Sequence, residues 1–327
     1  MLENIEHSEH SEHIEQILEN SNIHILTEGT DSQDISGTQQ ILTTLVQEKY
    51  NNSLLYKVCD VLPLTGTLGS IYVSKKKFNS NDFEIIKKQV VPTTKIINTS
   101  YTQEVYDDMR NMFGKSAAKS TGRVLRGISD LEENTALLDL LETESTIRSN
   151  LQIPSDMVIA DILLAISQKV SSSVLEMNHY SFKTLDSFCI LPRKYAAIFL
   201  GYFNYAIDGN ENEKLLHLGK VGTTDYYLNP LTPDTSKEFV ATEYNDAFTI
   251  GSFTDTNDPI FVGLHSKDPG LSSIIFSPYS YETKYVNDPD TFENVLFLYN
   301  RYGLNTSPLH LPLEKNSLLH KFNIEIT

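Results

Sequence analysis

Two cysteines and one Gly-Lys-Ser tripeptide have side chains that could carry chemistry, as a disulfide or metal pair or as part of a phosphate-binding loop. Cys59 and Cys189 lie about 130 positions apart in apolar surroundings, so we expect two buried free thiols. The tripeptide at residues 114–116 lacks the rest of a phosphate-binding loop, because that pattern needs an earlier glycine where Met109 stands. Nucleotide binding is therefore not predicted.

Histidine and acidic side chains could form a cation site at two places. His7, His10 and His13 recur at a period of three near the start of the chain, but nothing downstream completes such a site. The Asp-Gly-Asn-Glu run at residues 208–211 lacks the further oxygen ligands of a calcium loop and is more typical of a hairpin turn. The other carboxylates are scattered, without a nucleophile elbow or a dinucleotide fingerprint. We expect neither an enzyme nor a resident cofactor or metal.

The composition is that of an ordinary water-soluble folded protein. The 327 residues are 40% hydrophobic and carry a formal net charge of -17. Wrapping of nucleic acid needs Lys and Arg surfaces that replace phosphate counterions, so this charge argues against it. No run approaches the ~20 apolar residues of a membrane-spanning helix, and the N-terminus lacks the basic start of a signal peptide. We expect an intracellular product with no membrane partner.

Residues 1–28 differ in composition from the rest of the chain. They contain seven Glu, four His and no Lys or Arg, and so hold seven of the 17 excess negative charges. A segment this polar has little apolar surface to bury, so we expect a solvated tail or a removable interaction segment. Residues 29–50 begin small and polar and become weakly helical, and such a stretch could lie across a neighbour as an arm.

A turn followed by a hairpin is predicted over residues 61–98. Pro63, Gly66 and Gly69 lie close together, and such a cluster requires sharp changes of chain direction between extended segments. Residues 70–98 alternate apolar and polar side chains in two runs around an Asn-Ser-Asn-Asp turn cluster. The hairpin is also the most basic part of the chain. It is either a solvated projection or a loop that meets an acidic surface on an adjacent copy.

The longest run of helical periodicity spans residues 153–178, and we expect it to form a helical strut with one wet side. Pro154 and Ser155 suit a helix start. A second helix, from about residue 130 to residue 149, is acidic and resembles an added surface element. The apolar residues of the first helix recur every three or four positions. They are Val158, Ile159, Ile162, Leu163, Ile166, Val170 and Val174.

Four short motifs occur in order between residues 61 and 303. VLPLTGTLGSIYV (61–73) is similar to V-x-P-M-T/S-G-P-T-G-L-I-Y, a segment of the major capsid proteins of T-even-like tailed bacteriophages, except at Leu64 and at 67–68. HLGKVGTTDYYLNP (217–230) resembles that family's G-x-x-x-V-Y-V-D-P segment, with Asn229 in place of Asp. PIFVGLHSKDPGLSSIIFSPYSYE (259–282) and DTFENVLFLYNRYG (290–303) resemble its later segments. The matching positions that we expect to be structurally important are Pro63, Gly66, Gly69, Pro230, Pro278, Tyr279, Arg301, Tyr302 and Gly303.

This resemblance implies an α+β fold of the Hong Kong 97 capsid type. It implies a major capsid subunit that self-assembles into an icosahedral head shell and encloses DNA without sequence-specific contacts. The implied partners are further copies in hexamers or pentamers, together with vertex, portal, scaffold and prohead protease proteins, in a virion assembled in the host cytoplasm. The implied divisions are an acidic propeptide-like segment at 1–28, an N-terminal arm at 29–60, an extended loop at 61–99, a peripheral domain at 100–181 with a spine helix at 153–178 and an added segment at 115–150, an axial domain at 182–280, and a return to the peripheral domain at 281–327.

The same resemblance suggests proteolytic processing. Leu26, Thr27 and Glu28 fit the Leu/Ile-x-Glu rule of that family's prohead protease, which would cut before Gly29. Other tripeptides in the chain fit the rule, but the break in charge falls at Glu28. Loss of seven carboxylates per copy would make the interior of a shell less repulsive to DNA.

Two other functions remain open at this point. One is the pentameric vertex protein of the same family, which shares these motifs. The other is an acidic soluble binding or scaffolding protein, which would stay a monomer at high concentration.

Overall fold

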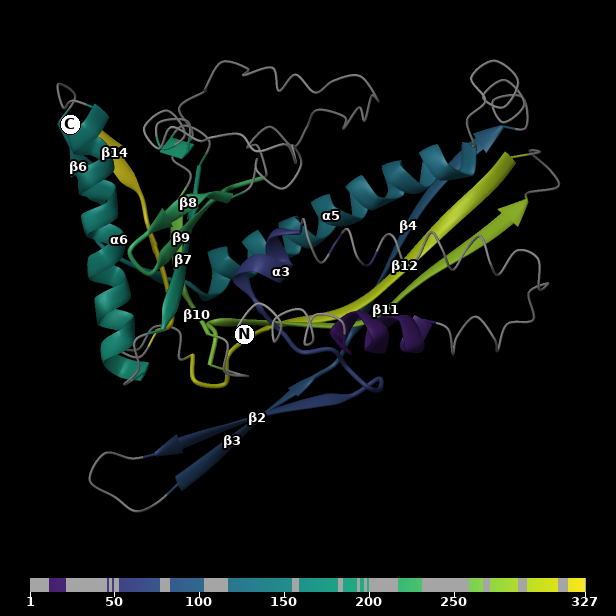
Figure 1. Ribbon diagram of the computed structural model, residues 1–327, viewed down its shortest axis with the longest axis horizontal. Helices are drawn as coiled ribbons and strands as arrows, with labels where there is room; N and C mark the ends of the chain where they lie inside the picture. Colours follow the sequence, from purple (N-terminus) through teal and green to yellow (C-terminus); the bar gives the residue numbers. More distant parts are fainter. Residues whose placement is uncertain are drawn as a thin grey trace, which may run out of the picture.

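The computed structural model describes residues 12–21, 46, 49, 53–76, 83–102, 117–154, 159–181, 185–192, 195, 196, 199, 217–230, 259–266, 271–287, 293–310 and 317–326. These residues form two sheets that share a core, two long helices, a short parallel strand pair and a separate hairpin (Figure 1). Neither of the long helices in this part of the chain is apolar enough over its length to cross a membrane.

The first sheet is built on two strands of 14 residues, which pair antiparallel along their length and are joined by two flanking strands. A 28-residue helix, α5, lies along one face (Figure 1). Alternate strand residues such as Tyr281, Leu296 and Leu298 are buried on that face together with Leu125 of α5. The strand order is β1 (Asp60–Val61), β11 (Ile274–Asn287), β12 (Glu293–Thr306) and β4 (Thr93–Thr102), and α5 spans Ala117–Glu144.

The second sheet has six strands and packs against helix α6. Its central strand β7 is buried along almost its whole length, as expected for a strand covered on both faces. The strand order is β5 (Thr146–Ile147), β13 (Leu319–Phe322), β10 (Ile260–His265), β7 (Asp186–Leu191), β9 (Thr224–Leu228) and β8 (His217–Val221). Beside this sheet lie α6 (Ile159–Ser181) and the parallel pair of β6 (Leu151–Ile153) and β14 (Ile324–Ile326).

The two sheets share one apolar cluster, so the body is a single packed unit. Phe188 and Phe261 of the second sheet pack there with Phe276 and Tyr302 of the first. A short helix, α3 (Leu54–Val58), also contributes to this cluster. The expectation of two buried free thiols is confirmed for Cys59 and Cys189, and burial raises the pKa of both thiols.

The predicted hairpin is present and leaves the body, but it ends at Val90, because residues 93–98 of the predicted range belong to β4 and pair with β12. Strand β2 (Gly69–Lys76) pairs with β3 (Phe83–Val90), and within the described residues neither strand pairs with any other. Figure 1 shows the hairpin pointing away from both sheets. In the described part of the chain, β2 and β3 therefore pair only with each other.

The predicted strut is correct in its buried stripe and wrong in its bounds. Leu163, Ile166 and Val170 are buried as expected, but α6 runs over Ile159–Ser181 instead of 153–178. Residues up to Ile153 are extended and pair with β14, because proline at 154 disfavours helical backbone in the preceding residue. The helix packs with the second sheet, whose strand β7 lies beyond the expected boundary at residue 182.

The expected surface segment at 115–150 is also corrected. It contains α5, which has 28 residues against the 23 of α6, and whose Leu137 and Leu141 are fully buried in the shared core. The helix therefore supports the first sheet over its length instead of lying outside it.

The acidic segment at 1–28 is not a solvated tail throughout. Residues 12–21 form a helix, and Ile17 in that helix has no exposed surface. The acidic side chains of Glu12, Glu15 and Glu19 point outwards, while Ile14, Ile17 and Leu18 face the core. A polar composition therefore hides an amphipathic helix.

Candidate functional site

The base of the hairpin gathers most of the residues that the sequence motifs singled out. We define the hairpin junction as Leu64, Gly69 and Val90 of the hairpin side with Pro278, Tyr279 and Gly303 of the first sheet. Pro63 lies in the connection that enters it, and Tyr302 pairs with Pro278 across the sheet. Pro230 lies apart, directly after β9 of the second sheet.

Backbone hydrogen bonds carry the chain from the sheet into the junction. After β1, the Leu62 amide donates to the Phe276 carbonyl and the Leu64 amide donates to the Pro278 carbonyl, both at 2.9 Å. The register between β11 and β12 then shifts between Pro278 and Ser280. Proline has no N–H to donate and is typical of such irregularities. The hairpin therefore separates from the sheet where β11 is bulged.

Two glycines allow the close approach of the hairpin to the sheet. A Cβ atom on Gly69 would overlap the Leu64 side chain, and one on Gly303 would overlap Cγ1 of Val90. At Gly66 an added Cβ would meet no atom, so the structure gives no steric reason for glycine there. Close packing thus explains why residues 69 and 303 are glycine.

The two faces of the hairpin have different environments. Near the junction, Ile71, Val73 and Val90 are buried against Ile275 and Tyr279 of β11. On the opposite face, the exposed fractions of Tyr72 and Ile85 are 60% and 70%. The Lys87 ammonium lies 5.6 Å from the centre of the Tyr72 ring. The hairpin is therefore anchored by one apolar face and presents a second one to the outside.

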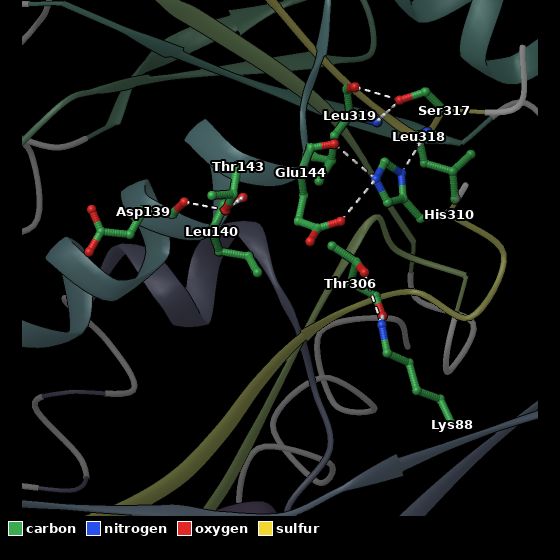
Figure 2. Close-up of polar contacts among 10 residues, drawn as sticks. All are labelled: Lys88, Asp139, Leu140, Thr143, Glu144, Thr306, His310, Ser317, Leu318 and Leu319. Carbon is green, nitrogen blue, oxygen red and sulfur yellow. Dashed lines mark hydrogen bonds and ion pairs between the residues drawn. The ribbon is translucent and has the colours of Figure 1, made fainter. Parts of the chain in front are cut away.

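Polar contacts fasten the hairpin base to the end of β12. The Lys88 ammonium donates to the carbonyl oxygen of Thr306 at 2.8 Å and to its Oγ1 at 2.9 Å (Figure 2). Partial burial lowers the pKa of Lys88, and the nearby Glu144 carboxylate opposes that shift. The Thr93 hydroxyl adds a bond to the Tyr302 carbonyl oxygen at 3.3 Å. These contacts fix the hairpin at its foot only.

A histidine links the end of α5 to the loop after β12. The Leu318 amide donates to Nδ1 of His310 at 3.1 Å, so the ring proton lies on Nε2 and is donated to the Glu144 carbonyl oxygen, also at 3.1 Å (Figure 2). Burial is the main cause that lowers the pKa of His310. The neutral ring satisfies both partners, so protonation would remove the acceptor that Leu318 needs.

A buried ion pair holds α5 on the first sheet. The ammonium of Lys49 and the carboxylate of Glu133 have no exposed surface and lie 2.6 Å apart. The amide of Asn300 and the hydroxyl of Tyr281 also donate to Oε1 of Glu133, and Ser129 accepts from Lys49. Burial raises the pKa of Glu133, while Lys49 lowers it. This cluster ties residue 49, α5, β11 and β12 together.

On the other face of the sheet, Arg301 links β12 to β11. Its guanidinium lies 3.4 Å from the Glu282 carboxylate, which neighbours it across β11 and β12.

Of the residues singled out by sequence, Leu26, Glu28 and Gly29 lie outside the described residues. Among the residues that the structure does describe, no three metal-ligating side chains come together. The arrangement at the junction positions the projecting hairpin.

A cleft of about 610 Å³ opens beside the junction, between α5 and the sheet. Its walls include Gln89 and Val91 from the hairpin base, Asp139 and Thr143 from α5, and Asn305 from β12. Lys95 of β4 and Tyr302 of β12 also line it.

The sequence matches no protein-family model and no curated protein. Solved structures do resemble the chain. The virus-like particle from Pyrococcus furiosus shares 11% identity, covers 87% of this chain and 98% of its own, and has a TM-score of 0.50. The capsid of cyanophage P-SCSP1u shares 10% identity over 85% and 89% of the two chains with a TM-score of 0.47, and the mature capsid of bacteriophage PhiM1 shares 12% over 84% and 87% with a TM-score of 0.47.

The likeness to the virus-like particle subunit extends over nearly all of that subunit, at an identity too low to speak for more than the fold. The chain has the α+β fold of the Hong Kong 97 capsid type, with its hairpin beside a sheet and a long helix.

Proposed function

We propose that this chain, which has the Hong Kong 97-type fold, is a structural shell subunit that acts by assembling with copies of itself. The observation that carries the proposal is the hairpin, which is anchored through one apolar face and leaves Tyr72 and Ile85 largely uncovered on the other. Contiguous apolar surface exposed to solvent is typical of interaction sites. A second copy that covers this face would bury that surface in a contact repeated by symmetry.

Charge supports the same partner. The hairpin strands carry Lys75, Lys76 and Lys87, whereas the chain as a whole has a net charge of -17. The exposed carboxylate of Asp139 lies on the C-terminal half of α5, which carries no basic residue in its last turn. A basic projection and an acidic body attract one another between copies while equal net charges keep the unassembled chains apart.

In finer detail, we propose the major capsid subunit of an icosahedral phage head that encloses DNA. The T-even-like motifs support this assignment. Portal, vertex, scaffold and protease partners, cleavage at Glu28, and assembly in the host cytoplasm belong to this proposal. The hairpin of β2 and β3, which is shorter than the expected range of 61–99, would be the extended loop, and the first sheet with α5 would replace residues 153–178 as the spine of the peripheral domain.

A shell that is not a virion is a second candidate. It is favoured by the likeness to the virus-like particle from Pyrococcus furiosus, because 98% of that chain is covered by the comparison. Nucleic acid measured inside purified particles separates the two, because only the head shell should retain DNA.

The shell proposal is tested with two variants of the full chain. Tyr72→Asp combined with Ile85→Asp places two charges on the bare hairpin face and should leave the protein as small species in light scattering. Leu175→Asp is the matched control, since Leu175 is 71% exposed on α6, away from the hairpin. The wild type and the control should form large closed particles in negative-stain images. Assembly of the double variant at the wild-type level, or a wild type that stays monomeric at high concentration, would contradict the proposal.

A further inference from the structure

The helix over residues 12–21 packs against the first sheet and forms hydrogen bonds with it. Figure 1 shows this purple helix lying beside β11. Ile17 is fully buried in a cluster with Tyr281, Leu298 and Leu125, which come from β11, β12 and α5. The contact thus reaches into the body between the sheet and α5.

Asn20 joins two segments that are far apart in the sequence. Its side chain is 5% exposed, and its amide donates to the Leu64 carbonyl oxygen at 2.7 Å and to the Tyr279 carbonyl oxygen at 2.9 Å. Both carbonyl groups belong to the hairpin junction. The amide oxygen accepts from Gln16 at 3.3 Å, so the group is held within its own helix. Only a side chain with two N–H groups on one nitrogen can bridge two carbonyl oxygens in this way.

Ser21 continues the contact along the edge of β11. Its hydroxyl oxygen accepts from the Tyr281 amide at 3.1 Å and its hydrogen is donated to the Ile17 carbonyl oxygen at 2.7 Å. The flanking chain that follows β1 makes its last bond to this edge at Pro278. The end of the helix therefore satisfies the next edge amide after the bulge, which would otherwise need another partner.

We propose that Leu64, Tyr279 and Tyr281 form a binding site for an amphipathic helix, that residues 12–21 are its ligand, and that occupancy of the site locks the hairpin base onto the first sheet. The site recognises an apolar residue at 17, an amide at 20 and a hydroxyl at 21. The outward-facing Glu12, Glu15 and Glu19 make no demand on it. Through this site the N-terminal segment controls how firmly the hairpin is held.

The test is amide hydrogen exchange in the unassembled full-length chain. Asn20→Asp keeps the size of the side chain but replaces the donating nitrogen with a single oxygen, which has no hydrogen to give to the Leu64 and Tyr279 carbonyl oxygens. We expect exchange at the Leu64 and Tyr281 amides, and at β2 residues such as Ile71, to become about tenfold faster or more, because each lost bond of this kind is worth on the order of 1 kcal/mol. Glu19→Gln is the control, since it changes an exposed carboxylate on the same helix, and it should leave these rates unchanged.

Wild-type exchange at Leu64 and Tyr281 in a folded Asn20→Asp chain would overturn the proposal, and so would an equal effect of Glu19→Gln. A milder variant covers the case in which Asn20→Asp does not fold. Ser21→Ala removes the acceptor of the Tyr281 amide and the bond to the Ile17 carbonyl within the same helix, but it keeps both bonds of Asn20, so exchange at Tyr281 should accelerate more than exchange at Leu64. An unchanged Tyr281 rate in Ser21→Ala would also overturn it. These readouts do not depend on assembly, so they stand or fall separately from the shell proposal.

Discussion

The buried cluster around Glu133 and the hairpin junction are attached to the same sheet in opposite ways. At Glu133 a carboxylate without exposed surface is held by Lys49, Asn300 and Tyr281, so α5 has one position on β11 and β12. At the junction, glycines, a bulge and the contacts of Lys88 hold only the foot of a hairpin whose other face is bare. The difference is that α5 is held rigidly on the sheet, whereas the hairpin is fixed only at its base.

The largest effect is expected at the buried cluster. Glu133→Gln leaves the Lys49 ammonium buried without its main counter-charge, and removal of one partner of a buried pair typically costs about 3–5 kcal/mol. Glu132→Gln is the control on the same helix, because Glu132 and its partner Lys95 are 31% and 43% exposed, and such pairs contribute about 1 kcal/mol or less. Denaturant unfolding of the unassembled chains measures both. Equal losses in the two variants would mean that the cluster does not hold the body.

A smaller effect is expected at the junction. Gly303→Ala places a methyl group against Val90, and overpacking of this kind costs roughly 1–3 kcal/mol. Gly66→Ala is the matched control, because nothing lies near an added Cβ at that position. Unfolding curves should show a loss only for Gly303→Ala, and hydrogen exchange should place that loss at the hairpin base. A larger loss for Gly66→Ala would show that the close approach has been misjudged.

The smallest effect is a dependence on pH. The pKa of His310 is lowered in the folded chain, and that of His320 is lowered to about 3, in both cases mainly by burial. A histidine with a depressed pKa in the folded state takes up its proton more readily when unfolded, so its contribution is present above its unfolded pKa of about 6.5 and is lost as pH falls below it.

We therefore expect the free energy of unfolding to decrease from pH 7 to pH 5. His310→Asn keeps an acceptor for the Leu318 amide but does not titrate, so the decrease should be smaller in this variant. The raised pKa of Glu133 acts in the opposite direction and is the same in both proteins, so the difference between them isolates the histidine. An identical pH slope in both proteins would show that His310 does not titrate in this range.

The hairpin and the stripe of α6 could be predicted because their signals are local. Residues 70–98 alternate around a turn cluster, and Leu163, Ile166 and Val170 repeat at helical spacing. The start of α6 could not be placed at Ile159, because the extended pairing of Ile153 depends on β14 at the other end of the chain. The α+β class and the fold type followed from the motifs, and residues from three of the four motifs meet at the junction although they lie more than 200 positions apart.

The burial of α5 could not be predicted from the sequence because polar residues lie on the buried side of the helix. Leu125, Ser129, Glu133, Leu137 and Leu141 repeat every four residues on the buried side. From the sequence alone, Ser129 and Glu133 are expected to face solvent. In the structure they are buried because their side chains form hydrogen bonds with Lys49 and Asn300. Pairing between residues so far apart in sequence is not visible in a local pattern.

The N-terminal helix did leave a signal. The spacing of three and four residues that is typical of a buried helix face occurs at Ile14, Ile17, Leu18 and Ser21. The high content of Glu and His in the same segment favours a solvated tail, so the two signals conflict. The processing residues Leu26, Glu28 and Gly29 remain a prediction, as does the importance of Pro230, which no contact at the junction involves.

A three-dimensional reconstruction of particles assembled from the full-length chain tests the shell proposal most directly. The proposal predicts a closed shell in which the Tyr72 and Ile85 side chains of every hairpin lie against a neighbouring copy. A shell in which these two side chains face solvent, or a protein that forms no particles under any assembling condition, would contradict it.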